Sequence, residues 1–365
     1  MRPFITPCFI MLSIISFAQN KLHPGFDANE HIQLFAVSRY GTDFADSVNT
    51  SETRRFKLVY QWPEGGLKNQ WSFFLSNDKA GLIAIRGTVG DKTSWLANFY
   101  AAMIPATGTL HLTDSTTFAY KFANDPKAAV HVGWAVSLGF MAESIVQQIK
   151  TNYANGVKDF YIFGHSQGGA IAFLTTSYLR YLQLDGKLPA DIQFKTYCNA
   201  GPKPGNTNYA YDYEFITRGG WGFNIVNMAD WVPETPYTVQ RMEDMHEVNP
   251  LIHTKDMLKK QNTFVRLVGN YAYGRFEAKP RKLQKKYTKF FGNTLYKYSI
   301  KKTLAQYQKP GYYPSSNYVR AGVPITLVPD EGYYKLFKFD ETKKDYFIHH
   351  HFNAYYYLLK KYYLK

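Results

Sequence analysis

The chain of 365 residues is 45% hydrophobic and 17% aromatic, and its formal net charge is +15. Its length suits one large α/β domain or two modest ones, and its hydrophobic content is ordinary for a globular protein. Beyond the N-terminus no apolar stretch is long enough to span a bilayer, which excludes a protein held in a membrane by internal helices.

The N-terminal segment has the pattern of a secretory signal. Arg2 is the only charged residue before Lys21, residues 8–17 are apolar, and Ala18 ends a small-residue cleavage pattern. The alternative is a buried N-terminal strand. We expect residues 1–18 to be removed and the mature protein to be soluble and exported, either periplasmic or extracellular. Cleavage would leave Cys198 as the only cysteine, so no internal disulfide is expected.

The elements that follow alternate between strands and helices. A polar segment with helical spacing, residues 19–52, precedes the first strand, and residues 131–149 form a second convincing helix. Residues 108–122 alternate as a hairpin would. The expected strands cover residues 56–62, 71–76, 81–85, 157–163, 192–199 and 222–227. This spacing predicts a mostly parallel sheet covered on both faces, within a single α/β domain over residues 19–365.

The chain is organised around the stretch that contains Ser166. A β-branched and aromatic run, residues 157–163, leads into Gly164-His165-Ser166-Gln167-Gly168, and helical spacing follows through residue 182. A strand that turns sharply into a helix needs small residues on both sides of the turn, and the two glycines supply them. The pattern predicts that Ser166 is a nucleophile raised above the sheet edge, rather than part of a plain loop.

A serine nucleophile needs a base and an acid. In α/β-hydrolases the order along the chain is Ser, acid, His, with each residue after a strand. Asp230 follows the strand at residues 222–227 and is the favoured acid; Asp212 and Glu214 are weaker candidates, and a plain turn aspartate is the alternative. The base must lie beyond Asp230. The histidines there are His246, His253, His349, His350 and His351.

The histidines near the turn have other expected roles. His165 adjoins Ser166 and so points away from it, as a packing residue under the turn. His131 is expected to be a structural or entrance residue.

The oxyanion of a tetrahedral intermediate needs N–H or O–H donors. The backbone of Gln167, at the helix start directly after Ser166, provides one. The segment Arg86-Gly87-Thr88 after an earlier strand provides a second, because Gly87 lets the backbone turn inward and Thr88 adds a hydroxyl.

These residues resemble the class 3 lipase family, the fungal- and plant-type lipases of α/β-hydrolase fold. The resemblance covers residues 55–240 and includes an Arg-Gly-Thr oxyanion segment, a His-x-Gly helix start, a Gly-His-Ser-x-Gly-Gly-Ala turn and an acid segment. It implies a base five residues before a tyrosine; His350 has that spacing to Tyr355, and His351 is a close second. Two features depart from the family. Gln167 replaces a leucine, which leaves the polarity of the substrate open, and a long basic insertion precedes the base.

The resemblance also implies a lid near the oxyanion segment. Residues 100–105, which include Met103 and Ile104, are apolar and could expose a face to a lipid interface. The alternative is an ordinary packed helix.

The insertion spans residues 242–318, and its residues 255–309 contain fifteen Lys or Arg against Asp256 and Glu277. Six of these cations crowd together: Lys279, Arg281, Lys282, Lys285, Lys286 and Lys289. On a helix Leu283, Tyr287 and Phe290 share one side. This pattern favours either a solvated helical face or an interfacial helix that holds an anionic membrane.

Together these features predict an exported serine hydrolase that cleaves carboxylic esters, namely the acyl esters of lipids. Ser166, Asp230 and His350 are its expected triad, and Thr88 and Gln167 are expected to bind the oxyanion. The alternatives are a polar-ester or amide hydrolase on the same triad, and a non-catalytic surface-binding protein of the same fold. No metal or organic cofactor and no nucleic-acid partner are implied, and the oligomeric state stays open.

Overall fold

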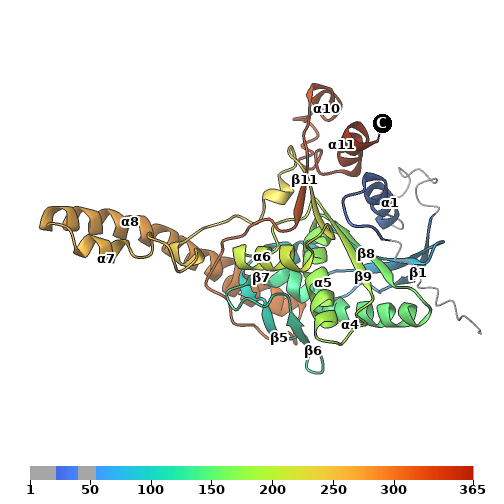
Figure 1. Cartoon of the computed structure of the whole chain (residues 1–365), viewed down its shortest axis with the longest axis horizontal. Helices are drawn as coiled ribbons and strands as arrows, with labels where there is room; N and C mark the ends of the chain where they lie inside the picture. The colour runs from blue at the N-terminus through green and yellow to red at the C-terminus, as the bar shows by residue number, and fades with distance from the viewer. Residues whose placement is uncertain (1–21, 40–54, 365) are drawn as a thin grey trace, which may run out of the picture.

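The computed structural model describes residues 22–39 and 55–364. At its centre lies a seven-stranded sheet in the order β1-β2-β3-β8-β9-β10-β11 (Figure 1). The strands β3, β8, β9, β10 and β11 run parallel, while β1 and β2 join them by antiparallel pairing. The mostly parallel sheet that the sequence predicts is therefore confirmed, with an antiparallel edge.

The bounds of the sheet strands agree with the predicted ones to within one residue at most ends. They are β1 Phe56–Gln61, β2 Trp71–Ser76, β3 Ala80–Ile85, β8 Asp159–His165, β9 Gln193–Asn199 and β10 Gly222–Asn227; the seventh strand, β11 Val323–Leu327, was not predicted. Four short strands lie outside this sheet: β4 Met103–Pro105 pairs with β7 Ala129–His131, and β5 Thr107–His111 with β6 Thr117–Lys121. The hairpin expected at residues 108–122 is thus confirmed as β5 and β6.

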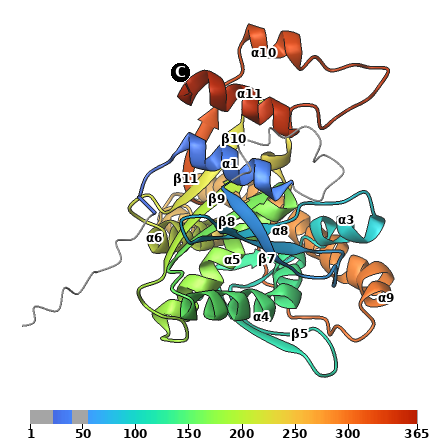
Figure 2. The same cartoon turned by 90° about the vertical axis from the view of Figure 1, so that its right-hand side faces the viewer.

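Helices cover both faces of the sheet (Figure 2). On one face lie α4 Val132–Ala154 and α5 Gln167–Leu184; on the other lie α1 Ala28–Ser38 and α11 Phe352–Tyr363. Side chains of a strand alternate between the two faces, so Ile83 and Ile85 of β3 pack with the first layer and Leu82 and Ala84 with the second. Both sets are buried, which explains why β3 reads as a continuous apolar run.

A buried ion pair attaches α1 to the sheet. The Glu30 carboxylate accepts hydrogen bonds from the hydroxyls of Tyr161, at 2.7 Å, and Tyr197, at 2.6 Å. It also accepts one from Nζ of Lys195 at 2.5 Å, and the Lys195 side chain is almost fully buried. A single residue of α1 therefore contacts two strands.

The remaining helices are short or belong to the insertion. They are α3 Lys92–Phe99, α6 Thr207–Ile216, α7 Thr254–Lys259, α8 Thr263–Thr288, α9 Lys301–Thr303 and α10 Glu331–Leu336, with 3₁₀ or π turns η2 Val232–Glu234, η3 Met242–Asp244, η4 Lys289–Thr294 and η5 Tyr296–Ile300. The helices α7 and α8 project from the body as an arm (Figure 1). None of the described helices combines the length and the apolarity needed to cross a bilayer.

Two sequence expectations are corrected here. Residues 100–105 are neither a lid nor a helix: Tyr100, Met103 and Ile104 are buried, and Met103–Pro105 is the strand β4. In the insertion, Tyr287 does not share an exposed side with Leu283 and Phe290, because it is buried against the body. The signal segment 1–18 lies outside the described residues.

Candidate active site

Ser166 lies at the sharp turn between β8 and α5. Its φ of 60° and ψ of −129° are values that residues with a side chain rarely adopt. The turn is possible because its flanking residues are glycines: a Cβ at Gly164 would lie 2.1 Å from the carbonyl oxygen of Gly168, and a Cβ at Gly168 would lie 2.2 Å from that of Ile85. The strand–turn–helix context predicted for Ser166 is therefore present, and the residue is partly exposed.

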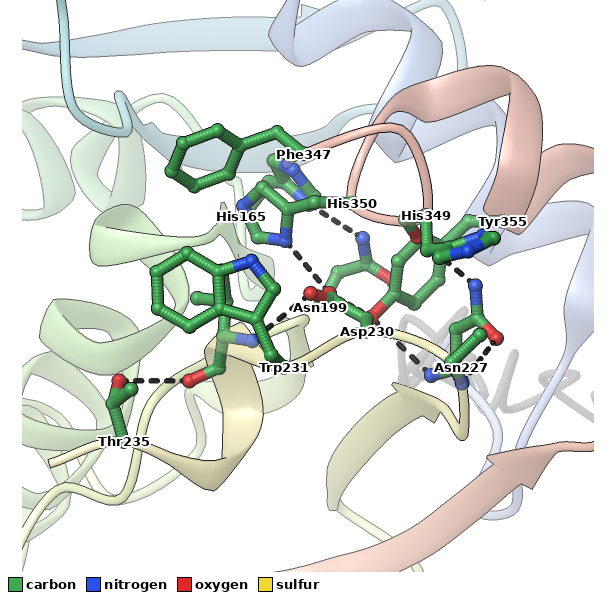
Figure 3. A network of polar contacts seen from close by, with 12 residues as sticks. His165, Asn199, Asn227, Asp230, Trp231, Thr235, Phe347, His349, His350 and Tyr355 are labelled. Atoms are coloured by element: carbon green, nitrogen blue, oxygen red, sulfur yellow. Dashed lines mark hydrogen bonds and ion pairs between the residues drawn. The ribbon is translucent and has the colours of Figure 1, made fainter. Parts of the chain in front are cut away.

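Asp230 and His350 form a direct pair (Figure 3). Nδ1 of His350 lies 2.7 Å from Oδ2 of Asp230, and both residues are buried, with 7% and 2% of their surface exposed. The hydroxyl of Tyr355 donates to the same carboxylate oxygen at 2.8 Å, and the backbone N–H of Val232 donates to Oδ1 at 3.0 Å. Three donors thus fix the carboxylate, and the carboxylate fixes the ring.

The other ring nitrogen of His350 is left available. Nε2 is buried, and no atom of the described residues forms a hydrogen bond with it. The ring of His165, the residue before Ser166, lies 4.4 Å from that of His350, centroid to centroid, so His350 packs against the end of β8. With Nδ1 held by Asp230, Nε2 is the atom that can take a proton from a hydroxyl at this sheet edge.

Hydrogen bonds anchor the loop that carries His350. Nδ2 of Asn227 donates to the carbonyl of His349 at 2.9 Å and to the hydroxyl of Tyr333 at 2.7 Å. That hydroxyl also lies 2.9 Å from Nδ1 of His349. Nε1 of Trp231 donates to the carbonyl of Tyr346 at 2.8 Å, which ties the loop to the residue after Asp230.

The rival acids and bases take other partners. His351 is half exposed and pairs with Asp345 at 2.9 Å, and the ring of His349 faces Tyr333. His246 accepts from the N–H of Val248, and His253 begins α7. Asp212 accepts from the hydroxyl of Tyr181 and the N–H of Asn124. Glu214 lies on α6, and desolvation raises its pKa.

His165 belongs to a chain of buried polar groups beneath the turn. Its Nδ1 lies 2.8 Å from Nδ2 of Asn199, whose Oδ1 lies 3.0 Å from Nε2 of His31. Desolvation between the rings of Phe35 and His350 lowers the pKa of His165 well below its ordinary value, and burial lowers the pKa of His31 to about 3. The expected packing role of His165 thus extends to contact with the base.

The segment with Gly87 and Thr88 lies beside Ser166. A Cβ at Gly87 would lie 3.6 Å from Cβ of Ser166, and any side chain there would crowd the nucleophile. The backbone N–H of Gln167 lies in the first turn of α5, where a helix has no acceptor of its own for such groups. Gln167 therefore follows Ser166 directly, and Thr88 follows Gly87, which packs against Ser166.

One residue of this region was missed by the sequence reasoning, Asn98 of α3. Its Nδ2 donates to Oγ1 of Thr88 at 2.9 Å, and its Oδ1 accepts from Nε2 of Gln167 at 3.0 Å. Oδ1 also accepts from Nε1 of Trp134 at 3.1 Å. The available signal was the spacing of Ser94 and Asn98, which are four apart and so share one side of the helix that follows the oxyanion segment.

The side chain of Gln167 is buried and points into the same network. It donates to the carbonyl of Ser94 at 3.0 Å and accepts from Asn69 at 3.3 Å. Ser94 in turn accepts from the N–H of Val89 in the oxyanion segment. The amide of Gln167 therefore bonds to Ser94, the residue that holds that segment, and the polar atoms of the amide are hydrogen-bonded inside the protein.

Aromatic side chains from distant parts of the chain surround the pair. The ring of Phe347 lies 5.8 Å from that of His350, 5.3 Å from that of Trp231 and 6.1 Å from that of Trp95. Trp95 stacks on Phe99, which is half exposed. The surface beside His350, here called the rim, is thus formed by aromatic side chains.

His131 caps α4 from inside the fold. Its Nδ1 accepts from the N–H of Trp134, its ring stacks on the Trp134 ring at 3.6 Å, and burial lowers its pKa to about 3. It is therefore structural. Within residues 22–39 and 55–364 no group of three or more His, Cys, Asp or Glu side chains is arranged to hold a metal ion.

Part of the chain is similar to a known family. Residues 82–240 match the family model for lipase (class 3). No curated protein sequence matches the chain. Similar solved structures include a mutant form of MDLA of Penicillium cyclopium, at 20% identity over 57% of this chain and 73% of that one, with a TM-score of 0.42. Mono- and diacylglycerol lipase from Aspergillus oryzae shares 18% identity over 58% and 73% of the two chains, with a TM-score of 0.41. Lipase from Rhizopus microsporus var. chinensis shares 17% identity over 59% and 71%, with a TM-score of 0.40.

The family match covers β3, α3, α4, the Ser166 turn and the Asp230 segment, in the order that the sequence landmarks predict. Over residues 82–240 the chain is thus similar to the class 3 lipases, and it has an α/β-hydrolase fold.

Proposed function

We propose that this protein is a serine hydrolase that cleaves carboxylic esters of lipids through an acyl-enzyme. Oγ of Ser166 attacks the acyl carbon while Nε2 of His350 takes its proton, and Asp230 stabilises the imidazolium that forms. The N–H of Gln167 and the hydroxyl of Thr88 stabilise the oxyanion. His350 then returns the proton to the departing alcohol. A water molecule, deprotonated by the same nitrogen, hydrolyses the acyl-enzyme and regenerates Ser166.

The observation that carries the proposal is the buried His350–Asp230 pair beside the strained turn at Ser166. The 2.7 Å contact occupies Nδ1 and leaves Nε2 without a partner among the described residues. His31 is also buried with one nitrogen unbonded, but its other nitrogen contacts an amide, whereas Nδ1 of His350 contacts a carboxylate; this carboxylate contact favours His350 as the base.

The rim favours an apolar acyl group. Trp231, whose ring lies beside that of Phe347, is 44% exposed, and Phe99, which stacks on Trp95, is 50% exposed; aromatic surface of this kind can bury a hydrocarbon chain. The amide of Gln167 is bonded internally, so the departure from leucine there is no longer an argument for a polar substrate. We infer lipid acyl esters as the substrate class, met at a lipid surface.

We also propose that the enzyme is exported, as one catalytic domain with a basic insertion. The support is the charge and apolar pattern of residues 1–18. N-terminal sequencing of the mature protein should begin at Gln19; a chain that starts at Met1 contradicts export by cleavage.

The activity is tested on p-nitrophenyl esters of increasing chain length, beside triglyceride and phospholipid. Ser166→Ala and His350→Ala should each lower kcat by roughly a million-fold, because removal of either residue disables the triad. The matched controls are Ser115→Ala, at the tip of the β5–β6 hairpin, and His351→Ala, which should stay within about twofold of wild type.

Labelling by a fluorophosphonate provides an independent readout and should be lost only in Ser166→Ala. Residual turnover within about tenfold of wild type in that variant contradicts the triad. A preference for polar esters or amides over long acyl chains would retain the triad but overturn the substrate class.

A further inference from the structure

The arm, defined as α7 and α8 with the residues between them (254–288), has two unlike sides. One side of α8 is covered along its length. Near the tip α7 packs on it so closely that a Cβ at Gly269 would lie 2.5 Å from Cδ2 of Leu258. Tyr273 donates to the carbonyl of Leu251 at 2.9 Å, and Lys255 pairs with Glu277 at 3.3 Å.

The same side of α8 attaches the arm to the body at its base. Gln284 and Tyr287 are buried, and Tyr287 packs with Met103 of β4, Ala129 of β7 and Tyr318. The positions 269, 273, 277, 284 and 287 recur at intervals of three, four and seven residues, so they form one continuous helical face. This face is therefore the structural one.

The opposite side of α8, here called the outer stripe, is uncovered and changes character along the arm. Near the tip it consists of Phe264, Leu267, Val268 and Tyr271, and Phe264 is 76% exposed. Closer to the body the same side continues with Arg275, Lys279, Lys282 and Lys286. The residues 264, 267, 268, 271 and 275 follow the i, i+3, i+4, i+7, i+11 spacing of one helical face.

The cations of the outer stripe are not neutralised by the protein. Lys279, Lys282 and Lys286 are exposed, and none of them forms an ion pair with a residue that the structure describes. Arg281, by contrast, lies off the stripe and pairs with Glu277 and Glu243. The acids of the insertion thus compensate the covered side and leave the stripe positive.

We propose that the outer stripe docks the enzyme on an anionic lipid surface, with the apolar tip inserted at the level of the headgroups and the lysines against their charges. An apolar face that continues into uncompensated cations matches such a surface in both its chemistries. A second copy of this chain fits less well, because two positive stripes would repel each other. The inference assigns to the arm a role separate from the Ser166 chemistry.

The test measures sedimentation of the full-length protein with vesicles of ether-linked lipids, which cannot be hydrolysed. One set contains phosphatidylcholine alone and the other equal parts phosphatidylcholine and phosphatidylglycerol. Wild type should bind the second set more tightly, and binding should fall steeply between low and physiological salt.

Two sets of substitutions on the stripe should weaken binding. Lys279→Gln, Lys282→Gln and Lys286→Gln together should cost about fivefold for each cation. Phe264→Ser, Leu267→Ser and Tyr271→Ser together should cost at least about tenfold.

Two matched control sets lie at exposed positions on the body. The first removes the same charge: Lys57→Gln, Lys150→Gln and Lys187→Gln. The second removes the same residue types: Phe215→Ser, Leu184→Ser and Tyr211→Ser. Both control sets should bind like wild type, and every variant should hydrolyse a soluble short-chain ester normally.

Equal binding to neutral and anionic vesicles overturns the proposal. Wild-type binding by the stripe variants also overturns it. So does a change in oligomeric state in the stripe variants with vesicle binding unaltered, which would assign the face to a second copy. Because binding is measured without turnover, Ser166→Ala should bind like wild type, and loss of hydrolysis in all samples would count against the triad alone.

Discussion

Asn98 is the single residue whose side chain connects most of the proposed oxyanion machinery. Its amide nitrogen donates to the Thr88 oxygen, so the Thr88 hydroxyl keeps its own hydrogen for another acceptor. Its amide oxygen is held by Gln167 and Trp134, which fixes the amide in this orientation. We therefore expect the side chains of Asn98 and Gln167 to position the hydroxyl of Thr88, while only the backbone N–H of Gln167 contacts the oxyanion.

A double-mutant cycle tests this positioning. Thr88→Val keeps the backbone donor, removes the hydroxyl, and should lower kcat by roughly a hundred- to a thousandfold. Asn98→Ala should lower kcat less, with KM for a short-chain ester nearly unchanged. In the Thr88→Val background Asn98→Ala should add little, because the group that it orients is already absent. Fully additive losses would show that Asn98 acts elsewhere.

At the scale of elements, the attachment of α1 depends on a carboxylate that serves two strands. Lys195 is buried, and Glu30 is its carboxylate partner, at 2.5 Å. Breaking a buried pair by removing one charge leaves the other uncompensated, which costs far more than the loss of a pair in solvent.

Glu30→Gln should therefore lower the free energy of unfolding by about 3 kcal/mol, measured by urea denaturation. The matched control is Asp191→Asn, which breaks the exposed pair with Lys158 and should cost less than about 1 kcal/mol. Adding Lys195→Met to Glu30→Gln should recover part of the loss, because the unpaired cation is then gone. Equal effects of the two single substitutions would mean that the buried pair contributes no more than a surface one.

At the scale of the whole molecule, stability should depend on buried neutral histidines. Desolvation by burial lowers the pKa of His31 and of His131 from 6.5 to about 3. Between those values the folded protein keeps both rings neutral while the unfolded chain binds protons, so protonation favours unfolding. Stability is then fully present above pH 6.5 and falls as the pH drops toward about 3, by about 1.4 kcal/mol per pH unit for each histidine.

Urea denaturation at about pH 7, 6 and 5 measures this slope, in a range above the titration of most carboxylates. The free energy of unfolding should decrease across the series. His131→Asn should be less stable at neutral pH but should show a shallower decrease, because one titrating group is missing. A flat profile in wild type would exclude linkage to these histidines.

Much of the fold and of the candidate site follows from local sequence. The strand that ends at Ile85 is a continuous apolar run, and those that end at His165 and Asn227 are largely apolar, because both their faces are buried; such runs are visible without a partner. The Ser166 turn is equally local, since its strain and its glycines lie within five residues. Asp230 was found because the acid of this fold follows a strand, and the strand itself could be recognised.

The choice of His350 as the proposed base depended on more than the sequence pattern alone. His350 and His351 are adjacent, and the resemblance favoured the first by its distance from Tyr355. The contacts give the physical reason: the Tyr355 hydroxyl and the His350 ring bond the same oxygen of Asp230, while His351 turns to Asp345. Asp230 and His350 are 120 residues apart in the sequence, so only the folded protein distinguishes His350 from His351.

By itself the sequence determined the order of elements, the strand–turn–helix around Ser166 and the position of Asp230 after β10, because each depends on neighbours along the chain. The tertiary structure alone decided where side chains of ambiguous segments point. It buried residues 100–104 and formed β4 at Met103–Pro105 instead of a lid, turned Gln167 toward Asn98, and covered the Tyr287 side of α8. A helix or strand pattern states which residues share a face, but only the packing of distant segments decides which face is covered.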